Sequence, residues 1–129
     1  MDYFLTDDQK MIKELSRQIA DEKIMPARAE LDEKEEFPWG IIKVLASSDL
    51  MGLCYPEEYG GLGGGTFENC LAVEEISRAC IGVSVCFAGT GLGAYPILLF
   101  GSEDQKKRYL PDIASGRKLA AFGLTEANA

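Results

Sequence analysis

The sequence predicts an all-α fold: a compact multi-helix domain over residues 1–117, followed at 118–129 by the first strand of a truncated β-domain. Three observations predict it. Apolar residues recur at helical spacing along most of the chain, and helix-capping signals precede two of these stretches. After Gly116 the pattern changes, because Leu119–Thr125 is a short apolar segment typical of a strand. The composition, 47% hydrophobic and 26% charged, is that of an ordinary globular domain.

The first predicted helix opens with Thr6 and Gln9, whose spacing is that of a capping box. Apolar residues follow at positions 11, 12, 15 and 19, and Pro26 is expected to end or kink the helix. A short second helix is expected over 27–34. A third begins at Pro38, which suits a first helical position, and carries its apolar residues on one face.

The glycine-rich stretch 56–65 predicts a loop. Thr66 is expected to cap a helix that runs to about Ala79, and the uncharged segment 83–100 forms a central helix.

Ser102 and Gln105 repeat the capping-box spacing before the last predicted helix. Pro111 is expected to split this helix and Gly116 to end it.

Charge and composition exclude several functions. The net charge is −8 and no long basic stripe exists, so the sequence predicts no nucleic-acid binding. Histidine is absent, which removes His-activated nucleophiles and His-ligated zinc. The four cysteines form no C-x-x-C pair, so no metal site is expected. With no signal peptide at Met1, we expect reduced thiols and a cytoplasmic location.

Residues 81–100 carry no charge and match a membrane span in length. They include four glycines and Pro96, a density of helix-breaking residues that favours a buried helix of a soluble protein. No membrane span is therefore predicted.

Two glycine-rich stretches and two acidic pairs bear on catalysis. Gly89–Ala94 matches G-x-G-x-x-A, but a helix precedes it and Pro96 follows, so small residues that permit close approach explain it better. Gly60–Gly65 lacks the G-K-[ST] of a phosphate loop. Glu57–Glu58 and Glu74–Glu75 are neighbours whose side chains diverge on a helix. We therefore identify no catalytic residue in this chain.

Four blocks, in order and near the expected spacing, resemble acyl-CoA dehydrogenases. The four blocks are Pro56–Gly63, Ala72–Ser77, Phe100 to Pro111, and Ala121–Glu126. Leu5–Thr6 and Gln9 also fit the family's first helix, and together these stretches cover nearly the whole chain. The family usually has proline where Ala127 stands, and alanine loosens this turn because it does not fix φ as proline does. The sequence stops at Ala129, before the family's Gly-Ser-Asp.

The resemblance implies an N-terminal helical domain, a middle β-barrel and a C-terminal helical bundle. It implies α,β-dehydrogenation of an acyl-CoA substrate in fatty acid metabolism, with FAD as cofactor and electron-transferring flavoprotein or a similar acceptor as partner. It also implies a homo-oligomer, a tetramer in the family. The catalytic base, usually a glutamate, lies in the family's C-terminal domain, so the fragment alone is expected to be inactive.

The resemblance also implies two sets of site residues. The flavin would be contacted by Phe122, Leu124 and Thr125, with the Thr125 hydroxyl near flavin N5. The acyl-chain pocket would be lined by Ser84, Val85, Ala88, Gly89 and Leu92. From the residues alone, the small side chains of this second set leave a groove that either a neighbouring helix or an acyl chain fills. Thr125 is equally consistent with a threonine of a β-strand whose hydroxyl forms hydrogen bonds only with backbone groups.

Two related enzymes, an acyl-CoA oxidase and a flavin monooxygenase, use the same scaffold and remain alternatives. A non-catalytic helical interaction domain is the alternative from a different class.

Overall fold

The computed structural model describes residues 4–127, and the regular structure within them is entirely helical, as the sequence predicts for the part up to residue 117. The elements in chain order are α1 (Asp7–Ile19), the π-helical turn η1 (Ala20–Ile24), α2 (Met25–Lys34), α3 (Trp39–Ser47), the 3₁₀ turns η2 (Leu50–Gly52) and η3 (Glu57–Tyr59), α4 (Thr66–Ala79), α5 (Ile81–Phe100) and α6 (Glu103–Ala114). The glycine-rich loop is confirmed, with η3 inside it.

Pro26 does not break the chain's first helical rod, which continues from α1 through η1 into α2. Proline lacks the N–H of a helix interior, and its ring clashes with the carbonyl four residues back. The wider π-helical turn lies directly before Pro26, and Pro26 falls in the first turn of α2, where no such hydrogen bond is needed. The predicted second helix at 27–34 is thereby confirmed, with its start two residues earlier.

Three helix boundaries differ from the prediction. Gly65, not Thr66, is the N-cap of α4, and its N–H donates to the Glu68 carboxylate at 2.8 Å. Pro38 is likewise the N-cap of α3 instead of its first residue. Helix α6 runs through Pro111 without splitting, because Leu110, Ile113 and Ala114 stay buried.

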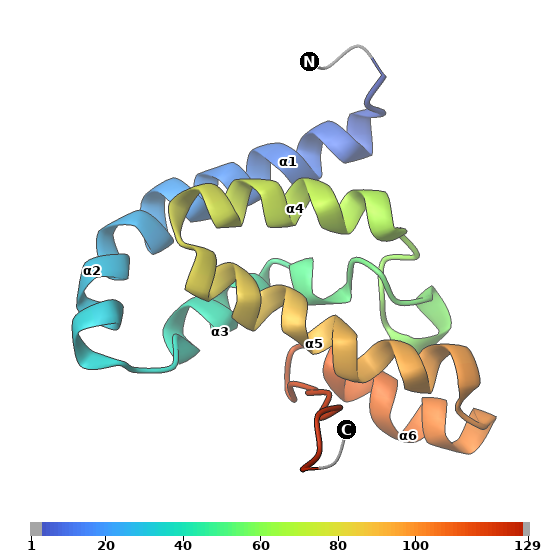
Figure 1. Ribbon diagram of the computed structural model, residues 1–129. Coiled ribbons are helices and arrows are strands. Elements are labelled where there is room, and N and C mark those ends of the chain that lie inside the picture. Colours follow the sequence, from blue (N-terminus) through green and yellow to red (C-terminus); the bar gives the residue numbers. More distant parts are fainter. Residues whose placement is uncertain (1–3, 128–129) are drawn as a thin grey trace.

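Two apolar cores hold the helices together. The larger one joins α1, η1, α3, η2, α4 and α5, and the smaller one joins η3, α5 and α6. Figure 1 shows α1 and α4 side by side, with α5 crossing below them and α6 folded back along its far half. Helix α5 contributes to both cores, through Val83 and Phe87 to the larger and through Ala94 to the smaller.

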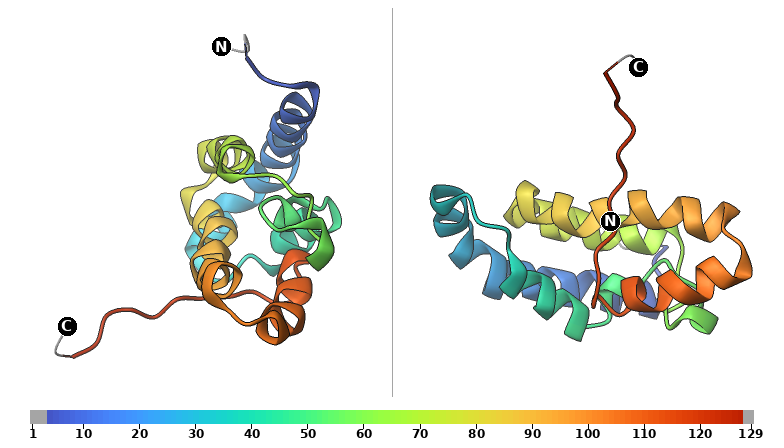
Figure 2. Two further views of the ribbon diagram at one scale, coloured as in Figure 1. Left: turned by 90° about the vertical axis from the view of Figure 1, so that its right-hand side faces the viewer. Right: turned by 90° about the horizontal axis from the view of Figure 1, so that it is seen from below.

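The predicted strand at 119–125 is not formed. This segment is extended, and no backbone hydrogen bond reaches it from elsewhere in residues 4–127. Figure 2 shows this segment leaving the helical body as a single extended piece of chain. A β-strand requires a partner for its N–H and C=O groups, and no described residue supplies one. The second domain from residue 118 onward stays a prediction.

A buried carboxylate ties α4 to α1. Glu75 is 2% exposed, and Arg17 of α1 donates to both of its oxygens at 2.9 Å. Arg78 contacts Glu75 at 3.4 Å and pairs with Asp21 at 2.5 Å. Burial raises the pKa of Glu75, but the hydrogen bonds and charges of the two arginines outweigh it, so the pKa lies below its ordinary value.

We expect Glu75→Gln to destabilise the chain by about 1–3 kcal/mol at pH 7, because charge-assisted hydrogen bonds are lost at a buried site. The folded state holds the carboxylate ionised more strongly than the unfolded state does. The stabilisation is therefore present above the unfolded pKa and is lost as pH falls through the lower folded value. Urea unfolding at pH 7 and at pH 3 measures both effects.

The exposed neighbour Glu74→Gln is the control and should leave stability nearly unchanged. Equal stability losses in the two variants, or a Glu75→Gln loss that is independent of pH, would contradict this account.

Candidate functional site

One face of α5 is apolar and uncovered by the rest of the described chain. Val85 and Leu92 are 63% and 64% exposed, and Ala88 and Gly89 lie between them, partly exposed. These positions are spaced at i, i+3, i+4 and i+7, so they share one face of the helix. A side chain at Gly89 would meet nothing within 4 Å. The structure therefore brings four of the five predicted acyl-pocket residues together on an open apolar surface, the α5 wall.

Ser84 does not belong to the α5 wall. It is 3% exposed, and its hydroxyl accepts a hydrogen bond from the Ser77 hydroxyl of α4 at 2.8 Å. Adjacent helical positions differ by about 100° around the axis, which turns Ser84 away from Val85 and toward α4. Ser84, which the resemblance places in the acyl-chain pocket, thus faces α4 in this structure, and its role toward substrate stays a prediction.

The opposite side of α5 is firmly packed. Val83, Phe87 and Ala94 are buried against the other helices, which fixes the α5 wall in place. Among the described residues, α5 is the one helix long and apolar enough to cross a membrane by length and composition, a test that buried core helices also pass.

The segment after α6 is anchored before it leaves the body. The Asp112 carboxylate pairs with Arg117 at 2.7 Å and with Lys118 at 2.7 Å, and the Lys118 N–H donates to the Asp112 carbonyl at 3.0 Å. Leu119 packs on the larger core and Ala120 on the smaller one. The chain then crosses α5 at Gly93, which lies directly beside Leu92 of the α5 wall.

Beyond that crossing lie the predicted flavin contacts. Phe122 and Leu124 are 54% and 72% exposed, and Thr125 is exposed beside them. Their side chains offer apolar and hydroxyl contacts, and their backbone groups have no partner within residues 4–127. A flavin ring has an apolar face and a polar, hydrogen-bonding pyrimidine edge, so the residues present fit this group. The same free edge also suits a neighbouring β-strand.

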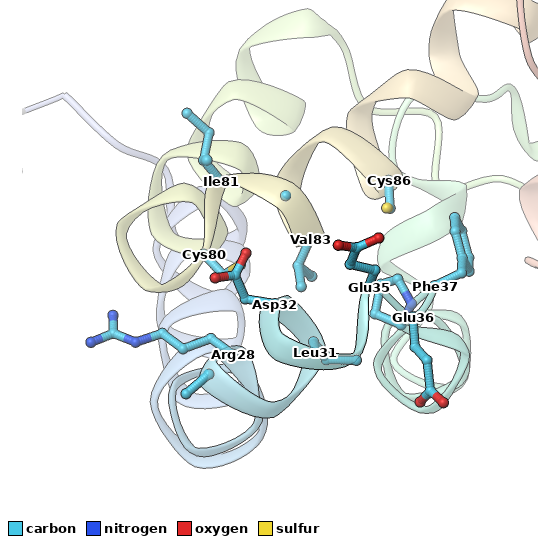
Figure 3. A pocket seen from close by; sticks show the side chains of 13 residues that line it. Arg28, Leu31, Asp32, Glu35, Glu36, Phe37, Cys80, Ile81, Val83 and Cys86 are labelled. Carbon is cyan, nitrogen blue, oxygen red and sulfur yellow. The ribbon is translucent and has the colours of Figure 1, made fainter.

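A hollow lies elsewhere, between the end of α2, the α2–α3 connection and the start of α5. Its volume is about 750 Å³, and Figure 3 shows side chains of Leu31, Phe37, Val83 and Cys86 around it. Asp32, Glu35 and Glu36 border it, and none of the five predicted pocket residues lines it. No histidine lines this hollow, and its two cysteines, Cys80 and Cys86, are free thiols.

The ionisable groups of the described residues include cysteines and tyrosines with shifted pKa values. No group of three or more His, Cys, Asp or Glu residues among them can hold a metal ion. Burial raises the pKa of the Cys54 and Cys86 thiols, and both cysteines are free. Thiols of this kind are protonated at neutral pH and are poor nucleophiles. Burial also raises the pKa of Tyr95 to about 12.

Two residues that shape the site were not identified as site residues from sequence. Gly93 was included only in a stretch of small residues that permit close approach, and Asp112 was not singled out. Their partners, Ala121 and the pair Arg117 and Lys118, come later in the chain, and only the fold reveals the contacts.

Together these features define a helical domain with an open apolar face on α5 and an extended segment that starts at the end of that face. Residues 6–117 match the family model "Acyl-CoA dehydrogenase, N-terminal domain". The chain belongs to the acyl-CoA dehydrogenase family and contains its N-terminal helical domain.

Known proteins agree with this assignment. The chain is 42% identical, over its whole length and 34% of the relative, to the probable acyl-CoA dehydrogenase YngJ of Bacillus subtilis. A chain in a solved structure of the electron-transferring flavoprotein of Acidaminococcus fermentans is 39% identical, with a TM-score of 0.93 over 100% of this chain and 34% of that one. Acyl-CoA dehydrogenase complexed with FAD from Bacillus anthracis is 36% identical, with a TM-score of 0.88 over 97% of this chain and 22% of that one. The chain thus spans about a third of the length of the curated relative.

Proposed function

We propose that this chain forms the acyl-pocket wall and the first flavin contacts of an FAD-dependent acyl-CoA dehydrogenase. The observation that carries the proposal is the junction at Leu92 and Gly93. There the uncovered apolar wall of α5 meets the segment whose next residues are Phe122, Leu124 and Thr125. An acyl chain on the wall would therefore lie beside a flavin held by that segment. The family match and the FAD complex of the Bacillus anthracis relative support this reading.

The proposed reaction removes a proton from the α-carbon and a hydride from the β-carbon of an acyl-CoA thioester. FAD supplies the hydride acceptor when bound. The residues of α5 contribute binding, because each CH₂ of the acyl chain that they shield from water is worth about 0.8 kcal/mol. They contribute no base, since residues 81–100 carry no ionisable carboxylate and Glu75 is engaged by two arginines.

The direct test uses the full-length protein that carries this segment. Purified protein should be yellow, and it should convert an acyl-CoA to the enoyl-CoA while an artificial electron acceptor is reduced. Hydrogen peroxide formed in air at the same rate would favour the acyl-CoA oxidase alternative, and an oxygenated product would favour a monooxygenase. A colourless protein that binds no flavin would leave the non-catalytic helical interaction domain as the remaining alternative.

Partners and location follow as further parts of the proposal. Electron-transferring flavoprotein is proposed as the acceptor, supported by the likeness to a chain in a structure of that flavoprotein. A homo-oligomer is proposed from the family, with large apolar residues such as Trp39 and Phe67 exposed on this domain. The four free cysteines suit a reducing compartment, which supports a role in cytoplasmic fatty acid metabolism.

We expect Ala88→Leu in the full-length protein to penalise long acyl chains. The added carbons project from the α5 wall into the space proposed for the acyl chain. Excluding about two methylenes costs roughly 1.6 kcal/mol, or about tenfold in kcat/KM. Rates with butanoyl-, octanoyl- and dodecanoyl-CoA should show the loss for the longer substrates only.

Ala29→Leu, the same change at an exposed position of α2, is the matched control. An equal loss for all three substrates, accompanied by lower stability, would mean that the groove at Ala88 serves helix packing.

Thr125→Val should remove the hydrogen bond between the Thr125 hydroxyl and the flavin in the full-length protein. Replacing the hydroxyl by a methyl leaves a buried polar partner unsatisfied, at a cost of about 1–3 kcal/mol. The flavin dissociation constant, reduction potential and reduction rate measure the effect, and Thr125→Ser should retain most of the parent's values. If all three quantities stay at the parent's values in Thr125→Val, the residue has only a backbone role.

A further inference from the structure

Gly93 is the one point of α5 at which another backbone segment lies too close for any side chain. A Cβ built on Gly93 would lie 2.5 Å from the Ala121 amide nitrogen, 2.7 Å from the Ala121 carbonyl oxygen and 2.8 Å from the Ala120 Cβ. Ordinary contacts between such atoms are about 3.5–4.0 Å. Two of the three neighbours are backbone atoms, which cannot rotate away as the end of a side chain can.

The other glycines of α5 are different. Gly89 has open space, and a Cβ at Gly82 would be 3.9 Å from the Cys80 sulfur, an ordinary distance. At Gly91 the near neighbour is the ring of Tyr95, one turn along the same helix. Alanine is the better helix former at any of these positions, so helix stability does not explain glycine at 93. The crossing of residues 120 and 121 does explain it.

The crossing segment has little freedom to move away. It is held on one side of Ala121 by the pairing of Asp112 with Arg117 and Lys118 and by the packing of Leu119 and Ala120 on the two cores. On the other side of Ala121 the chain is exposed and free of backbone hydrogen bonds within residues 4–127. A side chain at position 93 therefore displaces mainly the part that begins at Phe122.

We propose that Gly93 is a positioning residue that sets the spacing between the α5 wall and the flavin-contacting segment 122–125. The inference rests on the proposed function, and it deepens it by naming the contact that aligns the two parts of the site. Leu92 belongs to the wall, and Gly93 beside it touches the residue immediately before Phe122. The reacting carbons of the substrate must meet the flavin ring within contact distance. Displacements well below 1 Å at this junction therefore change the alignment of acyl chain and ring.

The test compares Gly93→Ala and Gly93→Val with Gly82→Ala in the full-length protein. Gly82→Ala is the matched control, because it is the same change on the same helix at a place with room for a Cβ. Three quantities are measured: the visible absorption spectrum of the bound flavin, the flavin dissociation constant, and hydrogen–deuterium exchange of the Lys118 amide, which donates to the Asp112 carbonyl. None of these readouts depends on turnover.

For Gly93→Ala we expect at least a tenfold weaker flavin affinity, shifted flavin absorption bands and faster exchange of the Lys118 amide, whose hydrogen bond to the Asp112 carbonyl anchors the crossing segment. Gly93→Val should exceed Gly93→Ala in each, and Gly82→Ala should match the parent. A Gly93→Ala protein with the parent's spectrum and flavin affinity would overturn the proposal, even if Gly93→Val fails to fold.

The outcome also separates this inference from the proposed function. If the parent itself binds no flavin, the proposed function fails and the positioning role fails with it. If the parent binds flavin and Gly93→Ala binds it equally well, the proposed function stands and only the role of Gly93 is rejected. The exchange measurement reports in either case whether the substitution disturbs the anchor of the crossing segment at Lys118.

Discussion

Helix α5 is apolar on every side, yet the other helices of the described chain cover only part of its surface. Val83, Phe87 and Ala94 face the two cores, whereas Val85, Leu92 and Leu99 face outward and are more than half exposed. A helix that is hydrophobic all round is normally covered on all sides. An apolar face left open in this way marks a surface for binding. The site, the crossing segment and the proposed substrate position all follow from this one helix.

The surrounding polar contacts serve mainly to hold α5 and its neighbours in place. Glu75 of α4 is shared by Arg17 and Arg78, which locks the layer of α1 and α4 on which α5 packs. Asp112 acts similarly at the other end, because it fixes the turn from α6 into the crossing segment. Neither carboxylate is free to exchange protons with a substrate. In the proposed function the chain supplies an apolar surface, and the proton chemistry falls to other residues.

Local signals in the sequence were sufficient for most helices. The boxes at Thr6 and Ser102 are confirmed with both of their hydrogen bonds, because a capping box involves residues only three apart. Pro111 was misread for a related reason: proline opposes a helix locally, but the burial of Leu110 and Ile113 across the chain outweighs it. The last strand was misread because strand formation depends on a partner that short-range patterns do not contain.

The site was predictable only in part. The sequence predicts Ser84, Val85, Ala88, Gly89 and Leu92 as the lining of one pocket, and the structure brings all of them except Ser84 onto one open face. The sequence did not reveal that Ser84 turns to Ser77 of α4, or that Gly93 meets Ala121 twenty-eight positions later. Both contacts depend on how helices and the final segment pack, which one sequence does not state.

The most direct measurement is a crystal structure of the full-length protein with FAD and a long-chain acyl-CoA analogue. The account predicts that the acyl chain lies along Val85, Ala88, Gly89 and Leu92, and that the flavin ring contacts the segment from Phe122 to Thr125. An acyl chain bound elsewhere, with the open face of α5 covered only by protein side chains, would contradict it.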